Sequence, residues 1–356
     1  MKMKNRNLPK RYTPTDDLES GGFGSVVKCL DTHLDRYVAI KSINDAHDSA
    51  RMRDELSALM RLRSKHVVEV FDAIEYEDGT ISIVEEFING PSLHEINDSI
   101  NDVNYLIKIL WQISSGIAEI HDCEIIHRDI KPGNMKIDHE GVVKIYDFGL
   151  SRNVDNAHTL GFKGTPIFAA PELFMQHVRF TKAVDTYAFA VTAMYLAKTK
   201  PPVELSYYPK QLNSNPFDSS EIQLPDFIKG LLYSCLDVDP KKRPAMQVVR
   251  DGLKNILLSN SHRALLITDY KKPVVLSETH RTEFYDNPGI GSIEITYSGS
   301  VFFISKLSGD VYVNNIRAKQ YNILPNSCVI ILGPAGKTKT KRVFITFDLS
   351  HPEVVL

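Results

Sequence analysis

The sequence has no long hydrophobic run and no excess of charge of one sign. Its longest largely apolar stretch, residues 188–197, contains Thr192 and is far shorter than the roughly 20 residues that span a bilayer as a helix. The basic start, MKMKNRNLPKR, lacks the apolar core of a signal peptide. Lys and Arg total 42 against 44 Asp and Glu, so the overall charge does not indicate nucleic acid or an anionic membrane as a partner. We therefore expect a soluble protein that binds neither.

Cysteine is also scarce. Cys29, Cys123, Cys235 and Cys328 lie far apart in the chain, without the close spacing of a metal clip or the pattern of a secreted disulfide framework. We expect reduced thiols and a cytoplasmic location. Hydrophobic residues make up 43% and charged residues 24% of the chain, which is close to the average of soluble globular proteins and excludes a wholly disordered or collagen-like chain.

The 356 residues leave room for about two to three domains, and the periodicity divides them into three parts. Residues 1–11 are predicted to form a disordered, solvated basic tail, with contact to an acidic partner as the alternative. Residues 12–258 begin with strand-like runs at 12–41, 67–74 and 81–87, and their helical patterns lie at 51–63, 106–120, 180–197, 227–236 and 246–258. This order predicts a β-rich lobe followed by a larger helical lobe.

Residues 259–356 show short strands broken by turns instead of helical periodicity. The strand-like runs are 292–297, 301–305, 311–313, 328–332 and 342–347. A stretch of this length, roughly 95 residues, suffices for an independent all-β sandwich.

Glycines at positions 21, 22 and 24 lie between two strand-forming runs. Glycine lets backbone N–H groups approach phosphate oxygens, because no Cβ intervenes. Lys41 ends a strand-like run and supplies a cation of the kind that triphosphate oxygens need, and Glu55 is the natural partner to hold it. Taken alone, a hairpin turn with a solvated Lys and Glu would explain these residues better. The segment that comes later in the chain decides between the two interpretations.

That segment, IHRDIKPGN, contains Asp129, Lys131 and Asn134, and a DFG triplet beginning at Asp147 follows it. Asn134 and Asp147 are hard oxygen ligands of the kind that Mg²⁺ prefers beside phosphate oxygens. Asp129 can orient a hydroxyl group and accept its proton, and Lys131 can offset charge on a phosphoryl group in transfer. The pattern indicates phosphoryl transfer from a metal-bound nucleotide to an alcohol.

This ordered set of motifs, with the GTPIFAAPE segment at 164–172, Asp185 and Arg243, resembles the eukaryotic-type (Hanks-type) protein serine/threonine kinase family over about residues 12–258. The resemblance implies an α+β, bilobal kinase fold with a β-rich N-lobe and a helical C-lobe. It also implies ATP and Mg²⁺, with Mn²⁺ as the alternative ion, and protein substrates with Ser or Thr acceptors. Asp185 would brace the catalytic loop, and Glu172 would pair with Arg243.

The resemblance also assigns roles to the matching positions. The catalytic residues would be Asp129 as the base, Lys131, Lys41 and Glu55, the last of which would pair with Lys41 in the active state. The nucleotide-binding residues would be Leu18, Gly21, Gly22, Phe23, Gly24, Val26, Ala39, Lys41, Glu86 and Ile88, together with Asn134 and Asp147. Asn134 and Asp147 would hold the metal ion, and the backbones of Glu86 and Ile88 would meet adenine.

Lys131 matches the serine/threonine-specific pattern, because tyrosine kinases usually carry an Ala-Ala-Arg segment there. Arg128 precedes the catalytic aspartate, where a guanidinium can pair with a phosphate. The resemblance therefore implies control by autophosphorylation of the activation segment. The candidate acceptors are Ser151, Thr159 and Thr165, of which we favour Thr159, since Thr165 belongs to the substrate-binding loop.

Three residues depart from the family pattern. Glu19 replaces the first loop glycine, where it either weakens ATP binding or points to solvent. Glu85 occupies the usually apolar gatekeeper position behind adenine. Because an unpaired buried carboxylate is costly, we expect Glu85 to contact a polar partner such as Lys41 or to tilt outward. Lys136 stands where Leu often lies beneath adenine, and its methylene stem can cover the ring while the ammonium reaches water.

Residues 292–315 and 324–333 resemble the second half of a forkhead-associated domain, a β-sandwich that reads phosphothreonine. The family's Gly-Arg pair and Ser-x-x-His segment have no clear counterparts here, and residues 289–292 lie where the latter should be. The alternatives are a phosphoprotein-binding module and a β-module that packs on the kinase or mediates self-association. The basic run 337–342 fits a solvated hairpin loop, with a phosphopeptide or nucleic-acid contact as the alternative.

The sequence favours an active kinase over two other functions. A nucleotide-binding pseudokinase scaffold that recruits partners through residues 259–356 is the alternative, and only Glu19 and Glu85 support it. Phosphorylation of a small molecule is opposed by the complete segment at 164–172, which resembles a platform for protein substrates.

Overall fold

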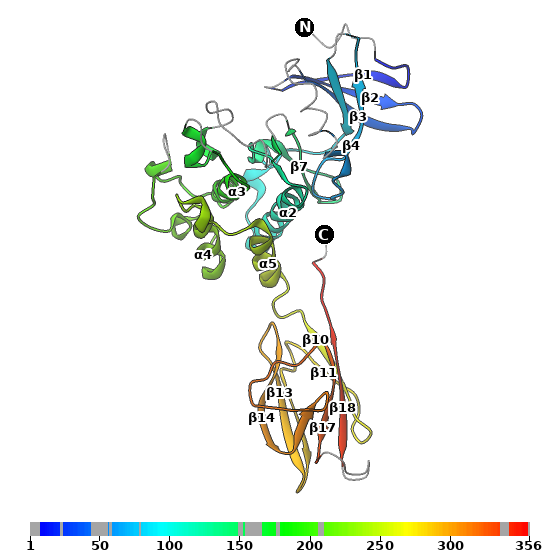
Figure 1. Ribbon diagram of the computed structural model, residues 1–356, viewed down its shortest axis with the longest axis vertical. Helices are drawn as coiled ribbons and strands as arrows, with labels where there is room; N and C mark the ends of the chain where they lie inside the picture. Colours follow the sequence, from blue (N-terminus) through cyan, green and yellow to red (C-terminus); the bar gives the residue numbers. More distant parts are fainter. Residues whose placement is uncertain are drawn as a thin grey trace. The chain divides into compact units, whose positions relative to one another are not determined.

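The computed structural model describes residues 8–21, 24–43, 56, 59–77, 80–148, 152–153, 166–175, 179–205, 210–334 and 342–354. For residues 16–21, 24–25, 42–43 and 152–153 the description covers the backbone alone. Contacts between residues divide the chain between Leu253 and Lys254 into two compact units (Figure 1).

The first unit begins with a five-stranded antiparallel sheet in the order β1-β2-β3-β5-β4. Its strands are β1 (Tyr12–Gly21), β2 (Gly24–Asp31), β3 (Arg36–Ile43), β4 (Val70–Glu75) and β5 (Ile81–Glu86). Cys29, Val38 and Ile40 are fully buried on this sheet. Burial of one face fixes the register of a strand, and this register places Lys41 of β3 opposite Val26 of β2.

Arg11 belongs to the folded first unit and not to the solvated tail in which the sequence analysis placed it. Its guanidinium donates two hydrogen bonds of 2.7 Å to the carboxylate of Asp31, which is completely buried. The hydrogen bonds from Arg11 lower the pKa of Asp31 to about 2. The sequence could not show this pairing, because the buried carboxylate lies on the far end of the next strand.

The helices described in the first unit are α2 (Val103–Asp122), α3 (Ala183–Leu196), α4 (Asp226–Cys235) and α5 (Met246–Leu257), which Figure 1 shows gathered together. Asp102 caps α2 by accepting a 2.7 Å hydrogen bond from the N–H of Tyr105. The predicted apolar stripe of α2 is confirmed, since Leu106, Ile113 and Ile117 are fully buried. Helix α3 is buried on nearly all sides, as befits a helix that is apolar all round.

Short elements connect these helices and carry much of the site. The paired short strands are β6 (Ile125–Ile126) with β9 (Arg152–Asn153) and β7 (Met135–Ile137) with β8 (Val143–Ile145). The one-turn 3-10 helices are η2 (Asn97–Ser99), η3 (Pro132–Asn134), η6 (Pro166–Phe168), η7 (Pro171–Phe174), η8 (Val203–Leu205), η9 (Pro216–Ser219) and η10 (Pro240–Lys242). Most of them begin with proline, whose fixed φ suits the first helical position.

The second unit is an all-β sandwich. One sheet has the strand order β11-β10-β18-β17-β15-β16 and the other β12-β13-β14. The strands are β10 (Arg263–Ile267), β11 (Val274–Leu276), β12 (Thr282–Asn287), β13 (Gly291–Tyr297), β14 (Phe302–Gly309), β15 (Val311–Val313), β16 (Ile316–Arg317), β17 (Ser327–Leu332) and β18 (Val343–Ser350). Both sheets contribute to one core, in which Leu266, Tyr297 and Phe347 are buried, so they pack face to face.

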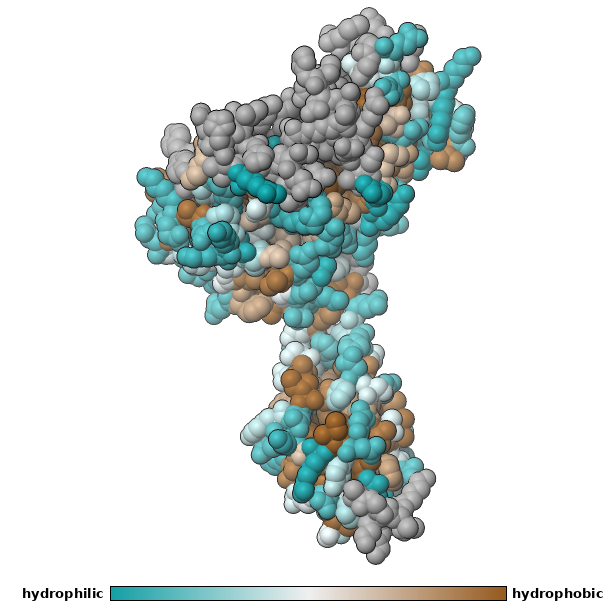
Figure 2. All heavy atoms as spheres, viewed as in Figure 1, coloured by the Kyte–Doolittle hydropathy of each residue, from teal (hydrophilic) through white to brown (hydrophobic). Residues whose placement is uncertain are grey.

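The surface of the sandwich carries several exposed apolar side chains. Ile316, Tyr321 and Ile323 are 75%, 70% and 65% exposed, and Figure 2 shows brown apolar groups among teal hydrophilic ones on the visible face of this unit. Scattered apolar residues are normal on soluble domains.

Within the described residues, no helix has both the length and the apolar character that a membrane span requires.

Two helical glycines give a matched test of the packing around α2. A Cβ on Gly116 would lie 2.8 Å from the carbonyl oxygen of His66, which cannot move freely because it accepts a hydrogen bond from the N–H of Ile145. A Cβ on Gly230 of α4 would meet nothing within 4 Å. We expect Gly116→Ala to lower the free energy of unfolding by about 1–3 kcal/mol and Gly230→Ala to raise it by up to about 1 kcal/mol.

Urea titrations monitored through Trp111, the single tryptophan, measure both effects, because this side chain is buried in α2. Equal stability changes in the two variants would contradict the packing described around Gly116.

Candidate active site

Asp129 is held in a short loop between β6 and η3, where its carboxylate has two neighbours. Lys131 Nζ donates to Asp129 Oδ2 at 2.8 Å, and Asn134 Nδ2 donates to the same oxygen at 2.8 Å and to the Asp129 carbonyl at 2.9 Å. Within the described residues both side-chain donors use Oδ2, so Oδ1 is the oxygen that remains to accept a proton. Three of the predicted catalytic and metal-binding residues are therefore brought together.

A second aspartate, Asp185 at the start of α3, supports this loop from beneath. Its carboxylate accepts hydrogen bonds from the backbone N–H groups of His127 and Arg128, each at 2.8 Å, and lies 2.9 Å from Nε2 of His121. Complete burial alone would raise the pKa of Asp185, but the hydrogen bond from His121 and the neighbouring charges outweigh burial and lower the pKa. The predicted bracing role of Asp185 agrees with this geometry.

The backbone is strained on both sides of the site. Arg128 and Asp147 both have a φ of 69°, a left-handed conformation that costs non-glycine residues about 1–3 kcal/mol each. The hydrogen bond from the Arg128 N–H to Asp185 holds one of these turns in place.

His127 connects the loop to the DFG segment. Its ring lies 4.7 Å from the ring of Phe148. Nδ1 accepts the N–H of Asp129 at 3.3 Å, and Nε2 lies 3.2 Å from the carbonyl of Tyr146, so Nε2 carries the proton. Burial lowers the pKa of His127, which keeps the ring neutral and able to serve as this bridge.

Lys41 of β3 meets Asp147 across a separation of 106 residues in the sequence. The ammonium contacts Oδ1 of the carboxylate, and the two side chains are 12% and 21% exposed. This contact brings the predicted nucleotide-binding lysine to the predicted metal ligand. The pairing of Lys41 with Glu55 stays a prediction, because Glu55 lies outside the described residues.

The donor set of Asn134 and Asp147 fits Mg²⁺. The Asp129 oxygens that face Asn134 can only accept hydrogen bonds, which assigns Nδ2 to that side and makes Oδ1 of Asn134 the atom available to a cation. In the described part of the chain no three His, Cys, Asp or Glu side chains form a metal cluster. One amide and one carboxylate oxygen suit an ion that keeps waters and binds substrate phosphates.

The residues expected around adenine whose side chains are described lie on β2, β3 and β5 and just after β5. Ala39 and Ile88 are each 7% exposed, and Val26 is half-buried. The N–H of Glu86 donates to the carbonyl of Glu69 at 2.9 Å, so a contact of Glu86 with adenine would have to use its carbonyl. The Glu86 carboxylate pairs with Lys144 at 2.9 Å, a partner that the sequence analysis did not name.

The structure shows what surrounds Glu85 and Lys136, two of the residues that depart from the family pattern. Glu85 is half-buried, and burial raises its pKa to about 7, although the charge of Lys41 opposes the rise. Lys41 is thus an electrostatic neighbour of Glu85, as expected, but no hydrogen bond joins the two among the described residues. The ammonium of Lys136 lies 5.9 Å from the centre of the Tyr146 ring.

The predicted ion pair between Glu172 and Arg243 is present. The Arg243 guanidinium donates to both carboxylate oxygens of Glu172, at 2.7 and 2.8 Å. It also donates to the carbonyls of Asp237 and Ala183, so a nearly buried charge is fully hydrogen-bonded. Bidentate geometry of this kind makes a strong pair.

Several residues that the sequence analysis assigned to the site or to phosphorylation lie outside the described part of the chain. These are Gly22, Phe23, Glu55, Ser151, Thr159 and Thr165. For Leu18 and Glu19 the backbone of β1 is described and the side chains are not, and Gly21 and Gly24 end β1 and begin β2 opposite each other.

Sequence reasoning missed His121, which donates to the buried carboxylate of Asp185. The signal was available, because His121 follows Ile120 on the apolar stripe of α2 and is only 2% exposed. A polar side chain on a buried helix face needs a partner, and the buried carboxylate beneath the catalytic loop is that partner.

The network around Asp185 gives a pH-dependent test. We expect Asp185→Asn to lower the free energy of unfolding by about 3 kcal/mol, because an amide cannot accept from all three donors. Since the pKa of Asp185 is lowered in the folded protein, its contribution is complete above about pH 4, the ordinary pKa of aspartate, and is lost as the pH falls further. Urea titrations should therefore show a gap between wild type and variant that is constant from neutral pH to mild acid and narrows below. A gap that widens in acid would contradict this assignment.

Comparison with known proteins agrees with this geometry. The family model of the protein kinase domain matches residues 12–252. The probable serine/threonine-protein kinase mkcB of Dictyostelium discoideum is 27% identical over 269 residues, which cover 70% of this chain and 37% of that protein. Mitogen-activated protein kinase kinase kinase 3 of Arabidopsis thaliana is 29% identical over 243 residues, which cover 64% of this chain and 39% of that protein.

The chain thus spans less than half the length of these two relatives. The matched family model covers more than half of the chain itself, and its range includes Asp129, Lys131 and Asn134. The chain belongs to the protein kinase domain family.

Proposed function

We propose that the protein is a serine/threonine kinase that transfers the γ-phosphate of ATP to Ser or Thr hydroxyl groups of proteins. The observation that carries the proposal is the convergence of Lys131 and Asn134 on the carboxylate of Asp129. The names of the relatives, a probable serine/threonine-protein kinase and a mitogen-activated protein kinase kinase kinase, support a protein kinase activity.

The residues of the site have separable tasks in this reaction. Oδ1 of Asp129 accepts the proton of the substrate hydroxyl, while Lys131 offsets the charge on the phosphoryl group. Lys41 binds phosphate oxygens of ATP. A bound Mg²⁺, or Mn²⁺ as the alternative, supplies charge neutralisation at those oxygens, and Asn134 and Asp147 would hold it. Positioning and electrostatics therefore account for the catalysis.

Lys131 also supports the choice of Ser and Thr over Tyr. Its ammonium reaches the same carboxylate oxygen as Asn134, as the serine/threonine-type loop would require. Thr165, in the substrate-binding loop, fits a hydroxyl-bearing acceptor.

We assign the kinase domain to residues 12–258 and a separate β-sandwich domain to residues 259–356. The division of contacts falls slightly earlier, between Leu253 and Lys254 within α5, so the last turn of this helix belongs to the second unit. The two-sheet core is compatible with a forkhead-associated-like domain that binds a phosphoprotein or mediates self-association. A cytoplasmic location accords with four unpaired cysteines.

The test of activity compares wild type with Asp129→Asn. Asparagine keeps the shape of the side chain but cannot take up a proton, so we expect transfer of radiolabelled phosphate to casein to fall by about 10²–10⁴-fold. The thermal shift produced by Mg²⁺ and ATP should persist. Asp251→Asn serves as the control, because within the described residues this exposed carboxylate pairs with Arg250 alone. Nucleotide binding without phosphate transfer by the wild type would favour the pseudokinase scaffold.

The second test concerns the activation segment. We propose that autophosphorylation at Thr159 raises the activity, since Arg128 precedes the catalytic aspartate and can pair with a phosphate. Thr159→Ala should lower the rate several-fold without changing the amount of bound ATP, whereas Ser151→Ala should have little effect. Mass spectrometry that finds Thr159 unmodified in active protein, together with an unchanged rate in Thr159→Ala, would overturn this proposal.

A further inference from the structure

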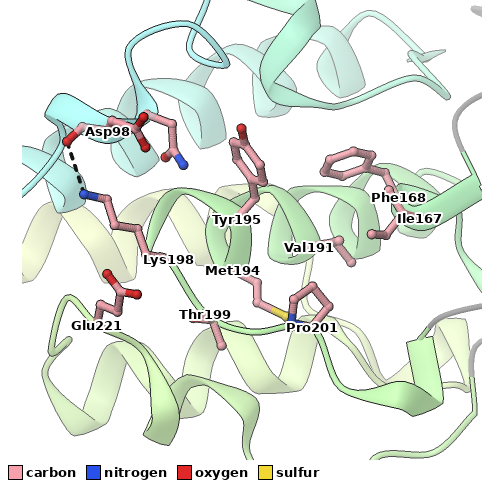
Figure 3. Close-up of a pocket in the computed structure, with 11 residues that line it drawn as sticks. Asp98, Ile167, Phe168, Val191, Met194, Tyr195, Lys198, Thr199, Pro201 and Glu221 are labelled. Atoms are coloured by element: carbon pink, nitrogen blue, oxygen red, sulfur yellow. Dashed lines mark hydrogen bonds between the residues drawn. The ribbon is translucent and has the colours of Figure 1, made fainter.

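A pocket of about 420 Å³ lies in the helical part of the first unit, and none of the predicted nucleotide-binding residues lines it. Residues from η2, from η6 and from the C-terminal end of α3 line it (Figure 3). Its size falls within the range of ordinary ligand sites, so it can take a long side chain with the adjoining backbone.

The pocket adjoins the catalytic loop through Phe168. This side chain lines the pocket and also a small cavity that Arg128 and Asp129 line. Ile167 and Phe168 follow directly after the substrate-binding loop, and Ile167 is 41% exposed. A polypeptide whose Ser or Thr reaches Asp129 would therefore pass this pocket.

One end of the pocket is apolar. Val191 and Met194 of α3 form its floor and are nearly fully buried, and Figure 3 shows them on the same side as Ile167, Phe168 and Pro201. An aliphatic stem would gain the free energy of apolar burial there.

The other end presents hydrogen-bond acceptors without partners. Asn97 Oδ1 is buried, and no donor of the described residues reaches it. The exposed carboxylates of Asp98 and Glu221 have no hydrogen-bond or ion-pair partner among the described residues. A buried acceptor is costly unless it is satisfied, so this end lacks a donor.

Two of the polar side chains that line the pocket, Lys198 and Tyr195, already have hydrogen-bond partners. Lys198 Nζ donates to the Asp98 carbonyl at 3.2 Å and to Asn101 Oδ1 at 2.7 Å, the former drawn as a dashed line in Figure 3. The hydroxyl of Tyr195 pairs with His94 at 2.8 Å. Two carboxylates against one ammonium leave a net negative charge, and the C-terminal end of α3 adds partial negative charge.

From this arrangement we infer that the pocket binds a basic side chain, arginine above all, at a position near the acceptor Ser or Thr of the substrate. An arginine has an aliphatic stem for the apolar floor and a planar group of donors that matches carboxylate and amide oxygens. The inference rests on the proposed kinase activity and adds the substrate class: proteins phosphorylated next to basic residues.

The experiment uses serine peptides that carry a single arginine at each position in turn on either side of the serine. In matched peptides the arginine is replaced by citrulline, which has the same shape without the charge. For the wild-type full chain we expect kcat/KM for arginine over citrulline to reach about tenfold at one or two positions. The double variant Asp98→Asn with Glu221→Gln should bring this ratio close to one. The double variant Asp98→Lys with Glu221→Lys should reverse the preference toward peptides with glutamate at the same position.

The control is Glu140→Gln, which should keep the arginine ratio. This carboxylate is 72% exposed, lies 4.0 Å from His139 and does not line the pocket. Fluorescence anisotropy of labelled peptides measures binding independently of phosphate transfer. Two results would overturn the inference: a wild-type enzyme that phosphorylates the arginine and citrulline peptides equally, or an arginine preference that survives in the double variant Asp98→Asn with Glu221→Gln. If no peptide is phosphorylated but arginine peptides bind through Asp98 and Glu221, the proposed function fails and the pocket assignment stands.

Discussion

The buried carboxylate of Asp185 organises the site without touching any reactant. It accepts hydrogen bonds from the backbone N–H groups of His127 and Arg128. Arg128 has a left-handed backbone conformation in this arrangement. That turn determines where Asp129 points and hence where Lys131 and Asn134 can meet it. Because His121 compensates the burial of the charge, the loop can keep a strained conformation. The position of Asp129 therefore depends on a charge deep in the helical part of the unit.

Much of this site could be predicted because its chemistry is local in sequence. Asp129, Lys131 and Asn134 lie within six residues, so one tight loop brings them together whatever the rest of the fold does. The long helix α2 was equally predictable, because its apolar residues recur at helical spacing and lie together on its buried face. The strands of the first sheet carried a similar signal through their β-branched runs.

The residues that escaped prediction depend on contacts between distant segments. Strand β10 has an uninterrupted apolar run, and only the sandwich decides that Leu266 is buried while Leu265 and Ile267 are exposed. Lys144 pairs with Glu86 across 58 residues, and Asn97, Asp98 and Glu221 meet around one pocket. Arg11 was assigned to a tail because a basic run looks solvated until its buried partner is known. In each case the arrangement of the strands and helices decides which residues meet or are buried. Hydrophobic periodicity along the sequence carries no information about that arrangement.

The half-buried carboxyl of Glu85 has a consequence for inhibitor design. If Glu85 lies behind adenine, as the resemblance implies, a compound that reaches this side chain would have to desolvate an acid whose pKa burial raises to about 7. A compound that places a protonated amine there would instead gain an ion pair, and it would draw the acid toward its charged form. A single basic substituent could thus recognise this side chain by its charge.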